Sequence, residues 1–167
     1  KGLSTLIEAV RDIVKVNTDL VLNVVGDGDM REEYENYVQS IGLEDNIKFW
    51  GKLDGDRLVE KYQKNHIFVS ASTNESFSMV ILEAMASSLP IIAFDVGSTS
   101  QMIENGKNGF LLSCSGAQQL KTKILELINS RELANEFGVK SRQKVEQNFT
   151  WDIKFDEYSG VIKQYIK

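Results

Sequence analysis

The sequence contains one cysteine, one histidine and one proline in 167 residues. Because Cys114 has no second cysteine to pair with, the chain has no internal disulfide and fits a reducing compartment. No apolar run approaches the roughly 20 residues that cross a bilayer, and no signal peptide is visible. The net charge is −5 without a basic cluster, so we expect no nucleic acid as a partner. These absences predict a soluble cytoplasmic domain, and leave open the oligomeric state and any peripheral attachment of a longer protein to the inner face of the membrane.

Short apolar runs alternate with helical patterns along the whole chain. Five runs are typical of buried strands, at 20–25, 47–50, 66–70, 90–94 and 109–112. The segments between and after them have helical spacing or composition, at about 2–17, 30–41, 55–64, 78–88, 99–104, 116–129, 131–147 and 150–166. Strands that alternate with helices predict an α/β fold, a Rossmann-like doubly wound parallel sheet with helices on both faces. We interpret residues 1–167 as a single domain of this kind.

The two ends of the chain do not fit a closed domain. The first element is an amphipathic helix at about 2–17, whereas this architecture expects a strand before it. We infer that the sequence starts partway into a larger unit and that the first strand is missing. The last helix has an aromatic face that includes Trp151, Phe155 and Tyr158, and we expect it to pack against something substantial.

The stretch from Ser70 to Ala93 is the centre of the functional argument. Its helix at 78–88 is apolar around its whole circumference and is predicted to be buried on all sides, with Ser76 or Ser78 as the N-cap. Glu83 nevertheless lies inside this helix, and Glu75 lies in the loop before it. Because an unpaired buried carboxylate costs several kcal/mol, both acids call for a partner, which is a ligand, a backbone amide or a lysine.

Open parallel sheets bind ligands beyond the carboxyl ends of their strands. Three segments fall at such ends, namely Gly26-Asp27-Gly28, Gly51-Lys52-Leu53 and Ser72 to Ser78. Glycines allow close approach of a ligand, and the start of the helix at 78 offers free N–H groups to anionic oxygens. A nucleotide or sugar phosphate is the natural ligand, although Gly-x-Gly alone is equally well explained as ordinary turn glycines.

The segment Glu75-Ser-Phe-Ser-Met-Val-Ile-Leu-Glu83, followed by Pro90-Ile-Ile-Ala, resembles the Glu-x(7)-Glu segment of retaining, nucleotide-sugar-dependent glycosyltransferases of the GT-B fold, the "group 1" family. The resemblance extends to Lys1-Gly2-Leu3, Val25-Gly26-Asp27-Gly28, Asn108-Gly109-Phe110-Leu111 and Phe149-Thr150-Trp151. It implies that the chain is the C-terminal, donor-binding half of a two-domain enzyme, with the helix at about 150–166 packing toward the N-terminal domain.

The resemblance also implies a role for each matching residue. Glu83 would accept hydrogen bonds from ribose hydroxyls, and Glu75 would lie beside the transferred sugar. Lys1 would neutralise the departing diphosphate together with an arginine upstream of residue 1. The remaining donor-binding positions would use backbone groups, glycine turns or apolar contact, and they are Gly26, Gly28, Lys52, Leu53, Ser76, Phe77, Ser78, Met79 and Val80. No metal and no cofactor are implied.

The implied reaction transfers a sugar from a nucleotide sugar, UDP-sugar in first place, to a glycan or lipid-linked acceptor held by the N-terminal half, in polysaccharide or glycolipid synthesis. The isolated chain would bind donor weakly and turn over nothing. Three alternatives stay open, namely a sugar-nucleotide epimerase of the same architecture, a non-catalytic nucleotide-binding module, and an ADP-sugar-dependent relative. The sequence departs from the family pattern at Ser78, where glycine or proline is usual, and at Gly97 to Gln101, which replaces Gly-Gly-x-x-Glu.

Overall fold

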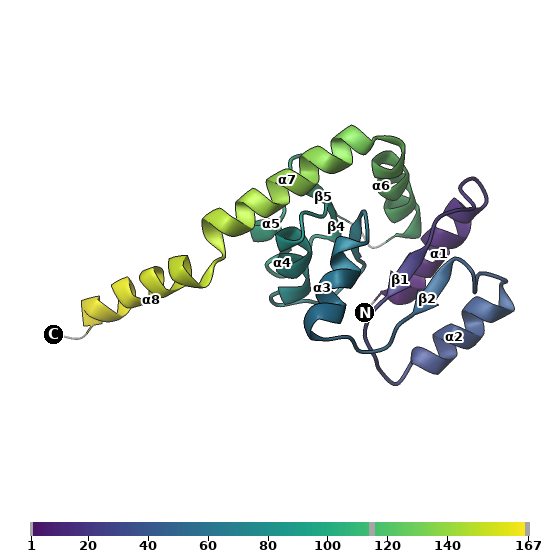
Figure 1. Cartoon of the computed structure of the whole chain (residues 1–167), viewed down its shortest axis with the longest axis horizontal. Helices are drawn as coiled ribbons and strands as arrows, with labels where there is room; N and C mark the ends of the chain where they lie inside the picture. The colour runs from purple at the N-terminus through teal and green to yellow at the C-terminus, as the bar shows by residue number, and fades with distance from the viewer. Residues whose placement is uncertain (1, 114–115, 166–167) are drawn as a thin grey trace.

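The computed structural model describes residues 2–113 and 116–165, which form five strands and eight helices (Figure 1). Each element lies at or close to its predicted position. The strands are β1 (Leu22–Val24), β2 (Ile47–Phe49), β3 (Phe68–Ser70), β4 (Ile91–Phe94) and β5 (Gly109–Leu112). The helices are α1 (Leu3–Val14), α2 (Arg31–Ser40), α3 (Gly55–Gln63), α4 (Met79–Ala86), α5 (Thr99–Met102), α6 (Ala117–Asn129), α7 (Arg131–Asn148) and α8 (Trp151–Tyr165).

Every strand pairing among the described residues is parallel, as the alternating pattern predicts. The strands nevertheless form two sheets rather than one, with the orders β1-β2 and β3-β4-β5. Leu22 is opposite Ile47 in the first sheet, and Phe68 is opposite Ile91 in the second. The predicted α/β fold with parallel strands is confirmed, and among the described residues no ladder joins β1 to β3.

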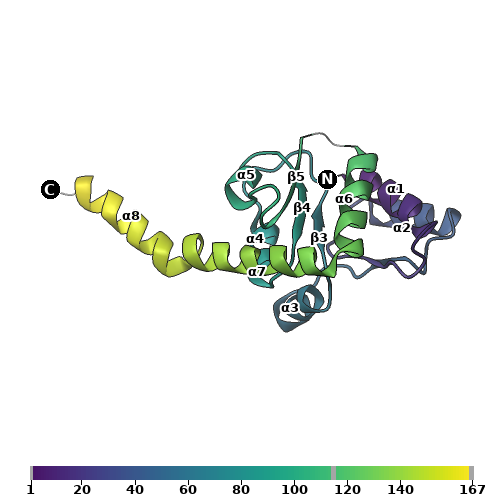
Figure 2. The ribbon, with the colours of Figure 1, turned by 90° about the horizontal axis from the view of Figure 1, so that it is seen from above.

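Helices cover both faces of the three-stranded sheet, as predicted. Figure 2 shows α4 on one side of β3, β4 and β5 and α6 on the other. On the α6 side, α1 packs against α6, and Phe110 and Phe137 meet edge to face with ring centroids 5.2 Å apart. On the opposite side α4 packs against α7. Strand β4 is buried along its whole length, so the core lies on both of its faces.

The Asn-Gly-Phe-Leu segment has a structural explanation. Asn108 is buried, its Oδ1 accepts from the Glu104 N–H at 2.7 Å, and its Nδ2 donates to the Met102 carbonyl at 3.1 Å. The Ser141 hydroxyl of α7 donates to the Asn108 carbonyl at 2.9 Å. Each buried polar group of this asparagine is therefore bonded, as burial requires. The turn that starts β5 is locked by these bonds.

Two expectations about burial are wrong. Helix α4 buries Ile81, Ala84 and Met85, but Met79 is 57% exposed and Val80 is 46% exposed, so the helix is not covered on all sides. Apolar residues lie on all sides of α4, but the described residues bury only part of this apolar surface.

The aromatic residues of the last helix are also exposed, with Trp151 87% and Phe155 71% accessible. Helix α8 extends away from the rest of the chain and contacts α7 (Figures 1 and 2). Large aromatic residues usually supply packing area, which predicts core positions for Trp50 and Trp151. This prediction is wrong for Trp151 in the described part of the chain. Among the described residues, no helix has the length and apolarity needed to cross a membrane.

Candidate functional site

A cavity of about 500 Å³ lies between β1 and β3 and reaches the residues that follow the carboxyl ends of the strands. Its inner walls come from β1, β3, α1 and α3. Six of the residues that the sequence singled out line this cavity, each from α4 or from a segment that follows a strand, namely Gly26, Lys52, Leu53, Glu75, Val80 and Glu83. The fold thus brings together, at the edge where open parallel sheets bind ligands, residues separated by up to three strand–helix units.

The Glu83 carboxylate is held by a tyrosine. Tyr62, near the end of α3, donates its hydroxyl hydrogen to Glu83 Oε2 at 2.9 Å. No lysine or arginine among the described residues forms an ion pair with Glu83. A carboxylate can accept about four hydrogen bonds, so acceptor positions are left for a ligand. Burial, together with the hydrogen bond to Glu83, raises the pKa of Tyr62 well above its usual value, so the phenol remains a donor at neutral pH.

The loop that carries Glu75 is fixed by the loop that follows β4. The Ser98 N–H donates to the Ser76 carbonyl at 3.3 Å. Gly97 has a φ of +56°, and a Cβ placed on it would lie 1.7 Å from the Glu75 carbonyl oxygen. Only glycine fits this close approach. Glu75 itself is half-buried and lines the cavity.

The start of α4 differs from the prediction in its capping. Ser78 occupies the N-cap position, but its side chain makes no capping hydrogen bond, and its buried hydroxyl has no partner in the described part of the chain. The hydrogen-bond donors at this helix start are therefore left without a side-chain cap. The segment from Ser76 to Met79 lies in the sequence between Glu75 and Val80, which both line the cavity. None of its four residues is among those that line the cavity.

The two glycine turns are joined by an arginine that sequence reasoning overlooked. The Gly26 N–H donates to the Gly51 carbonyl at 2.8 Å. Arg31, the first residue of α2, pairs with Asp27 at 3.6 Å and with Glu35 at 2.7 Å, and its Nη1 would lie 2.7 Å from a Cβ on Gly51. These partners hold the pKa of Arg31 above its ordinary value. Arg31 follows Gly28 by only three residues, and this proximity could have indicated from the sequence that its side chain contacts the glycine turn. Gly28 itself is exposed in the same turn and does not line the cavity.

A polar network on the α3 side was also missed. Trp50, expected in the core, is 45% exposed, and its Nε1 donates to Asn23 Oδ1 at 2.7 Å. The Asn23 Nδ2 donates in turn to Asn65 Oδ1 at 2.9 Å, and Lys61 Nζ lies 3.2 Å from the Trp50 ring centroid. Asn23, Asn65 and Lys61 line the cavity. An asparagine inside the apolar run LVLNVV was the signal that could have revealed this network.

Lys1 and Cys114 lie outside the described residues, so the structure does not place the predicted diphosphate-binding lysine.

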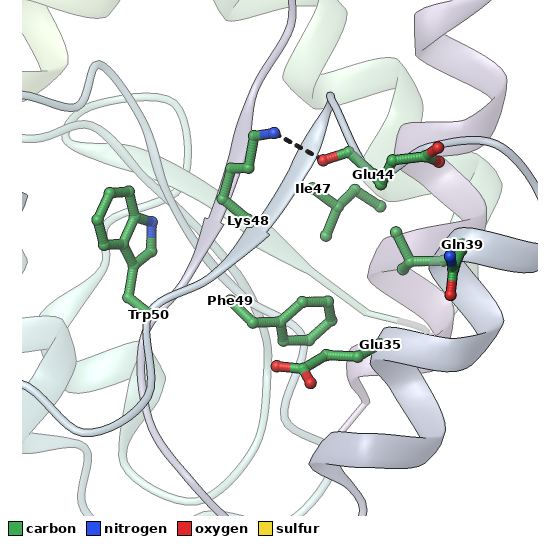
Figure 3. A pocket seen from close by; sticks show the side chains of 8 residues that line it. Glu35, Gln39, Glu44, Ile47, Lys48, Phe49 and Trp50 are labelled. Carbon is green, nitrogen blue, oxygen red and sulfur yellow. Dashed lines mark hydrogen bonds between the residues drawn. The ribbon is translucent and has the colours of Figure 1, made fainter.

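A second hollow, of about 400 Å³, lies between α2 and the outer face of β2. Figure 3 shows Phe49 turned toward Glu35 of α2, whereas Trp50 points away from that helix. Glu35 pairs with Arg31, and Lys48 bonds the Glu44 carbonyl at 2.8 Å. This hollow shares no lining residue with the larger cavity and contains neither Glu75 nor Glu83. It is not the site that the sequence predicts.

Comparison with known proteins gives the family. The profile of the family described as "Glycosyl transferases group 1" matches residues 1–144. The chain belongs to this family. A glycosyltransferase of Methanocaldococcus jannaschii that is described as uncharacterized is 34% identical over 152 residues, which cover 91% of this chain and 41% of that protein.

Solved structures of other glycosyltransferases share the fold. Sucrose-phosphate synthase from Thermosynechococcus elongatus superposes with a TM-score of 0.86 at 27% identity, over 99% of this chain and 42% of that one. A pneumococcal O-GlcNAc transferase, solved with UDP and GlcNAc, superposes with a TM-score of 0.85 at 26% identity, over 99% of this chain and 33% of that one. The chain has the fold of the C-terminal domain of GT-B glycosyltransferases and spans less than half the length of these relatives.

Proposed function

We propose that this chain is the donor-binding domain of a retaining glycosyltransferase that transfers a sugar from a nucleotide sugar, UDP-sugar in first place, to a glycan or lipid-linked acceptor. The observation that carries the proposal is that Glu75 and Glu83 line the same cavity, together with residues that follow the carboxyl ends of the strands. Glu83 is held by a neutral phenol rather than by a cation, so its charge and most of its acceptor capacity remain for a ligand. Membership of the glycosyltransferase family supports the same reading.

In this proposal the donor binds in the cavity beside Glu75, Glu83 and the residues that follow the strands. Glu83 accepts hydrogen bonds from the ribose hydroxyls, and Val80, half-exposed on the same helix, contacts the ribose ring. The backbone of Lys52 and Leu53 flanks the base, and the turn at Gly26 and Gly28 allows close approach. Lys52 and Leu53 contribute backbone groups, which do not identify the base by the nature of a side chain. The choice of UDP is therefore supported chiefly by similarity to a structure solved with UDP.

The reacting end of the donor lies at the start of α4. Uncapped N–H groups around Phe77, Ser78 and Met79 are donors for sugar hydroxyls or the diphosphate, and the positive end of the helix dipole favours the departing anion. Glu75 stabilises positive character on the sugar as the bond to the diphosphate breaks. Lys1 and an arginine upstream of it neutralise the leaving diphosphate. The acceptor hydroxyl then attacks from the face that the diphosphate leaves and gives its proton to the departing diphosphate oxygen, which retains the anomeric configuration.

The test is titration calorimetry of the longer protein against UDP-, GDP- and ADP-sugars. A Glu83→Gln variant should bind the preferred donor about 10- to 100-fold more weakly, because a hydrogen bond to a charged group contributes about 1.5–3 kcal/mol. The control is Glu60→Gln on α3, whose carboxylate is exposed and paired with Lys64. Equal donor affinity in wild type, Glu83→Gln and Glu60→Gln would contradict the assignment of Glu83.

Product analysis separates this function from its rivals. The glycosyltransferase needs an acceptor, and NMR of the product should show the anomeric configuration of the donor. Epimerised or hydrolysed donor in the absence of acceptor would instead indicate an epimerase, and unchanged activity of Glu75→Ala would favour a non-catalytic role for this domain.

The acceptor site is proposed to lie on an N-terminal domain, toward which α8 packs. The relatives are more than twice as long as this chain, and the side chains of Trp151, Phe155 and Tyr158 are exposed on a helix that extends from the body. An isolated chain of residues 1–167 should therefore bind donor weakly and transfer no sugar. Transfer at the rate of the longer protein would contradict this division.

The packing of α8 is tested in the longer protein by its stability. Phe155→Ser should lower the free energy of unfolding by about 1.5–3 kcal/mol if another domain buries this ring. Val139→Ser on α7, also exposed, is the matched control and should change the free energy of unfolding by less than about 0.5 kcal/mol. Equal effects of the two variants would show that α8 has no such partner.

A further inference from the structure

Trp50, which directly follows β2, is 45% exposed and yet held at three points. Its backbone N–H donates to the Val24 carbonyl at 2.9 Å, and its indole Nε1 donates to Asn23 Oδ1 at 2.7 Å. The Lys61 ammonium of α3 lies 3.2 Å from the centroid of the ring. A large aromatic side chain usually contributes through the area it buries. Trp50 buries only part of its surface, and its polar contacts fix its position instead.

Asn23 is the centre of this network. It is opposite Lys48 in the ladder, and Trp50 lies two residues after Lys48. Residues two apart along a strand point to the same face, so Asn23 and Trp50 share a face, and Figure 3 shows Trp50 turned away from α2. The Asn23 Nδ2 donates to Asn65 Oδ1 at 2.9 Å, and the Asn65 Nδ2 donates to the Lys61 carbonyl. Each polar side-chain atom of the two asparagines and the indole therefore has a partner.

Stability alone does not explain an asparagine at position 23. Its neighbours in the run LVLNVV are apolar, and an apolar side chain there would avoid the cost of removing an amide from water. A fully satisfied polar network, in contrast, selects one arrangement of the groups that it joins. The network therefore serves to fix the orientation of Trp50.

The segment next to Trp50 depends on this anchor. The Gly51 carbonyl accepts from the Gly26 N–H at 2.8 Å. Lys52 and Leu53 come next and line the cavity, and within the described part of the chain neither residue forms a hydrogen bond. Their backbone N–H and C=O groups are thus available to a ligand, and their position is set by the fixed residues before them.

Backbone groups can distinguish bases only when they are held in place. The hydrogen-bonding edge of uracil presents a donor between two acceptors, whereas the edge of adenine presents an amino donor beside a ring acceptor. Each residue offers one N–H and one C=O, and hydrogen bonds weaken steeply when their geometry is distorted. A displacement of the segment at Lys52 and Leu53 would therefore change which base fits best.

We propose that Asn23 is a positioning residue for base selectivity. Through Trp50 it holds the backbone of Lys52 and Leu53 in the register that selects the base of the nucleotide sugar, and Asn65 keeps the Asn23 amide turned toward the indole. Asn23 acts through these residues and does not touch the base. The inference rests on the proposed function, but it concerns which base is preferred and not whether a donor binds.

Base selectivity is measured by titration calorimetry of the longer protein with UDP, GDP and ADP, which differ only in the base. The wild type should bind one of them at least about 10-fold more tightly than the other two, the factor that one hydrogen bond supplies. Asn23→Leu keeps a side chain of similar size without the amide, and it should bring this ratio close to one. Trp50→Phe removes the same hydrogen bond from the other side and should lower the ratio equally, with no further loss in the double variant. If Asn23→Leu fails to fold, Trp50→Phe carries the same test.

Asn46→Leu is the matched control. The Asn46 Nδ2 donates to the carbonyls of Thr18 and Leu20, both at 2.8 Å, at the opposite end of the same sheet and outside the cavity. This variant should lower the Tm and leave the selectivity ratio at the wild-type value. A ratio that falls as far in Asn46→Leu as in Asn23→Leu would overturn the proposal, because general loosening of the sheet would then be sufficient.

Two other results would also decide against the proposal. The wild-type ratio retained in both Asn23→Leu and Trp50→Phe would overturn it and leave the proposed function intact, as would equal binding of the three nucleotides by the wild type. A wild type that binds none of the three would contradict the proposed function itself, and this inference with it.

Discussion

Replacing Gly97 with alanine would place a methyl group where the structure has the Glu75 carbonyl. The Cβ would lie 1.7 Å from that oxygen, whereas an ordinary van der Waals contact of a Cβ lies at 3.4–4 Å. The obstacle is backbone rather than a flexible side chain, so the loop after β3 and the loop after β4 must separate by about 1.5–2 Å to restore normal contact. Glu75 moves with its loop.

This displacement should appear mainly in catalysis. A misplacement of about 1 Å can reduce a rate about 100-fold, so we expect Gly97→Ala to lower the kcat/KM of the longer enzyme by at least this factor. Steady-state transfer assays with the preferred donor give the rate, and thermal unfolding gives the stability. Alanine at a positive φ also costs about 1–2 kcal/mol, and each kcal/mol lowers the Tm by about 2–4 °C in a domain of this size.

Gly42→Ala separates the two effects. Gly42 has a φ of +66° and no atom within 4 Å of the position that a Cβ would take, so alanine there bears the conformational cost without the collision. We expect its Tm to fall and its kcat/KM to stay at the wild-type value. If Gly97→Ala has the same kcat/KM as Gly42→Ala, the argument that Gly97 positions Glu75 is wrong.

Three further outcomes follow from the contacts. Tyr62→Phe removes the bond to the Glu83 carboxylate and should raise the donor KM about tenfold with little change in kcat, measured by transfer kinetics; an unchanged KM would contradict the role of Tyr62. Arg31→Met should loosen the two glycine turns and weaken donor binding in calorimetry, and equal affinity would show that the turns hold without it. Lys107 and Lys144 lower the pKa of Glu104 to about 2 from an ordinary 4.5, so its contribution to stability is present above pH 4.5 and lost as the pH falls toward 2. In acid unfolding, the free energy of unfolding of Glu104→Gln should therefore fall less than that of the wild type between pH 4.5 and pH 2.

Local sequence pattern was enough to predict the order and type of the helices and strands. Apolar runs such as LVLNVV and IIAF are typical of strands, and the amphipathic segments between them have the period of helices, so local pattern was sufficient. It also identified Glu75 and Glu83, because charged residues in an apolar setting conflict with packing. The polar partners Tyr62 and Arg31 were overlooked, since on helices rich in charge a tyrosine or an arginine is typical of a solvated face.

Which apolar surfaces are buried could not be predicted from local pattern and follows from the three-dimensional packing of the chain. The exposure of Met79, Trp50 and Trp151 depends on neighbours far along the chain or beyond the described residues. The apolar character of a side chain does not say which other residues bury it. The separation of β1 from β3 was equally unpredictable from local pattern, because strand pairing is a long-range interaction. The hydrogen bond between Tyr62 and Glu83 joins residues 21 positions apart, and it forms because α3 and α4 border the same cavity.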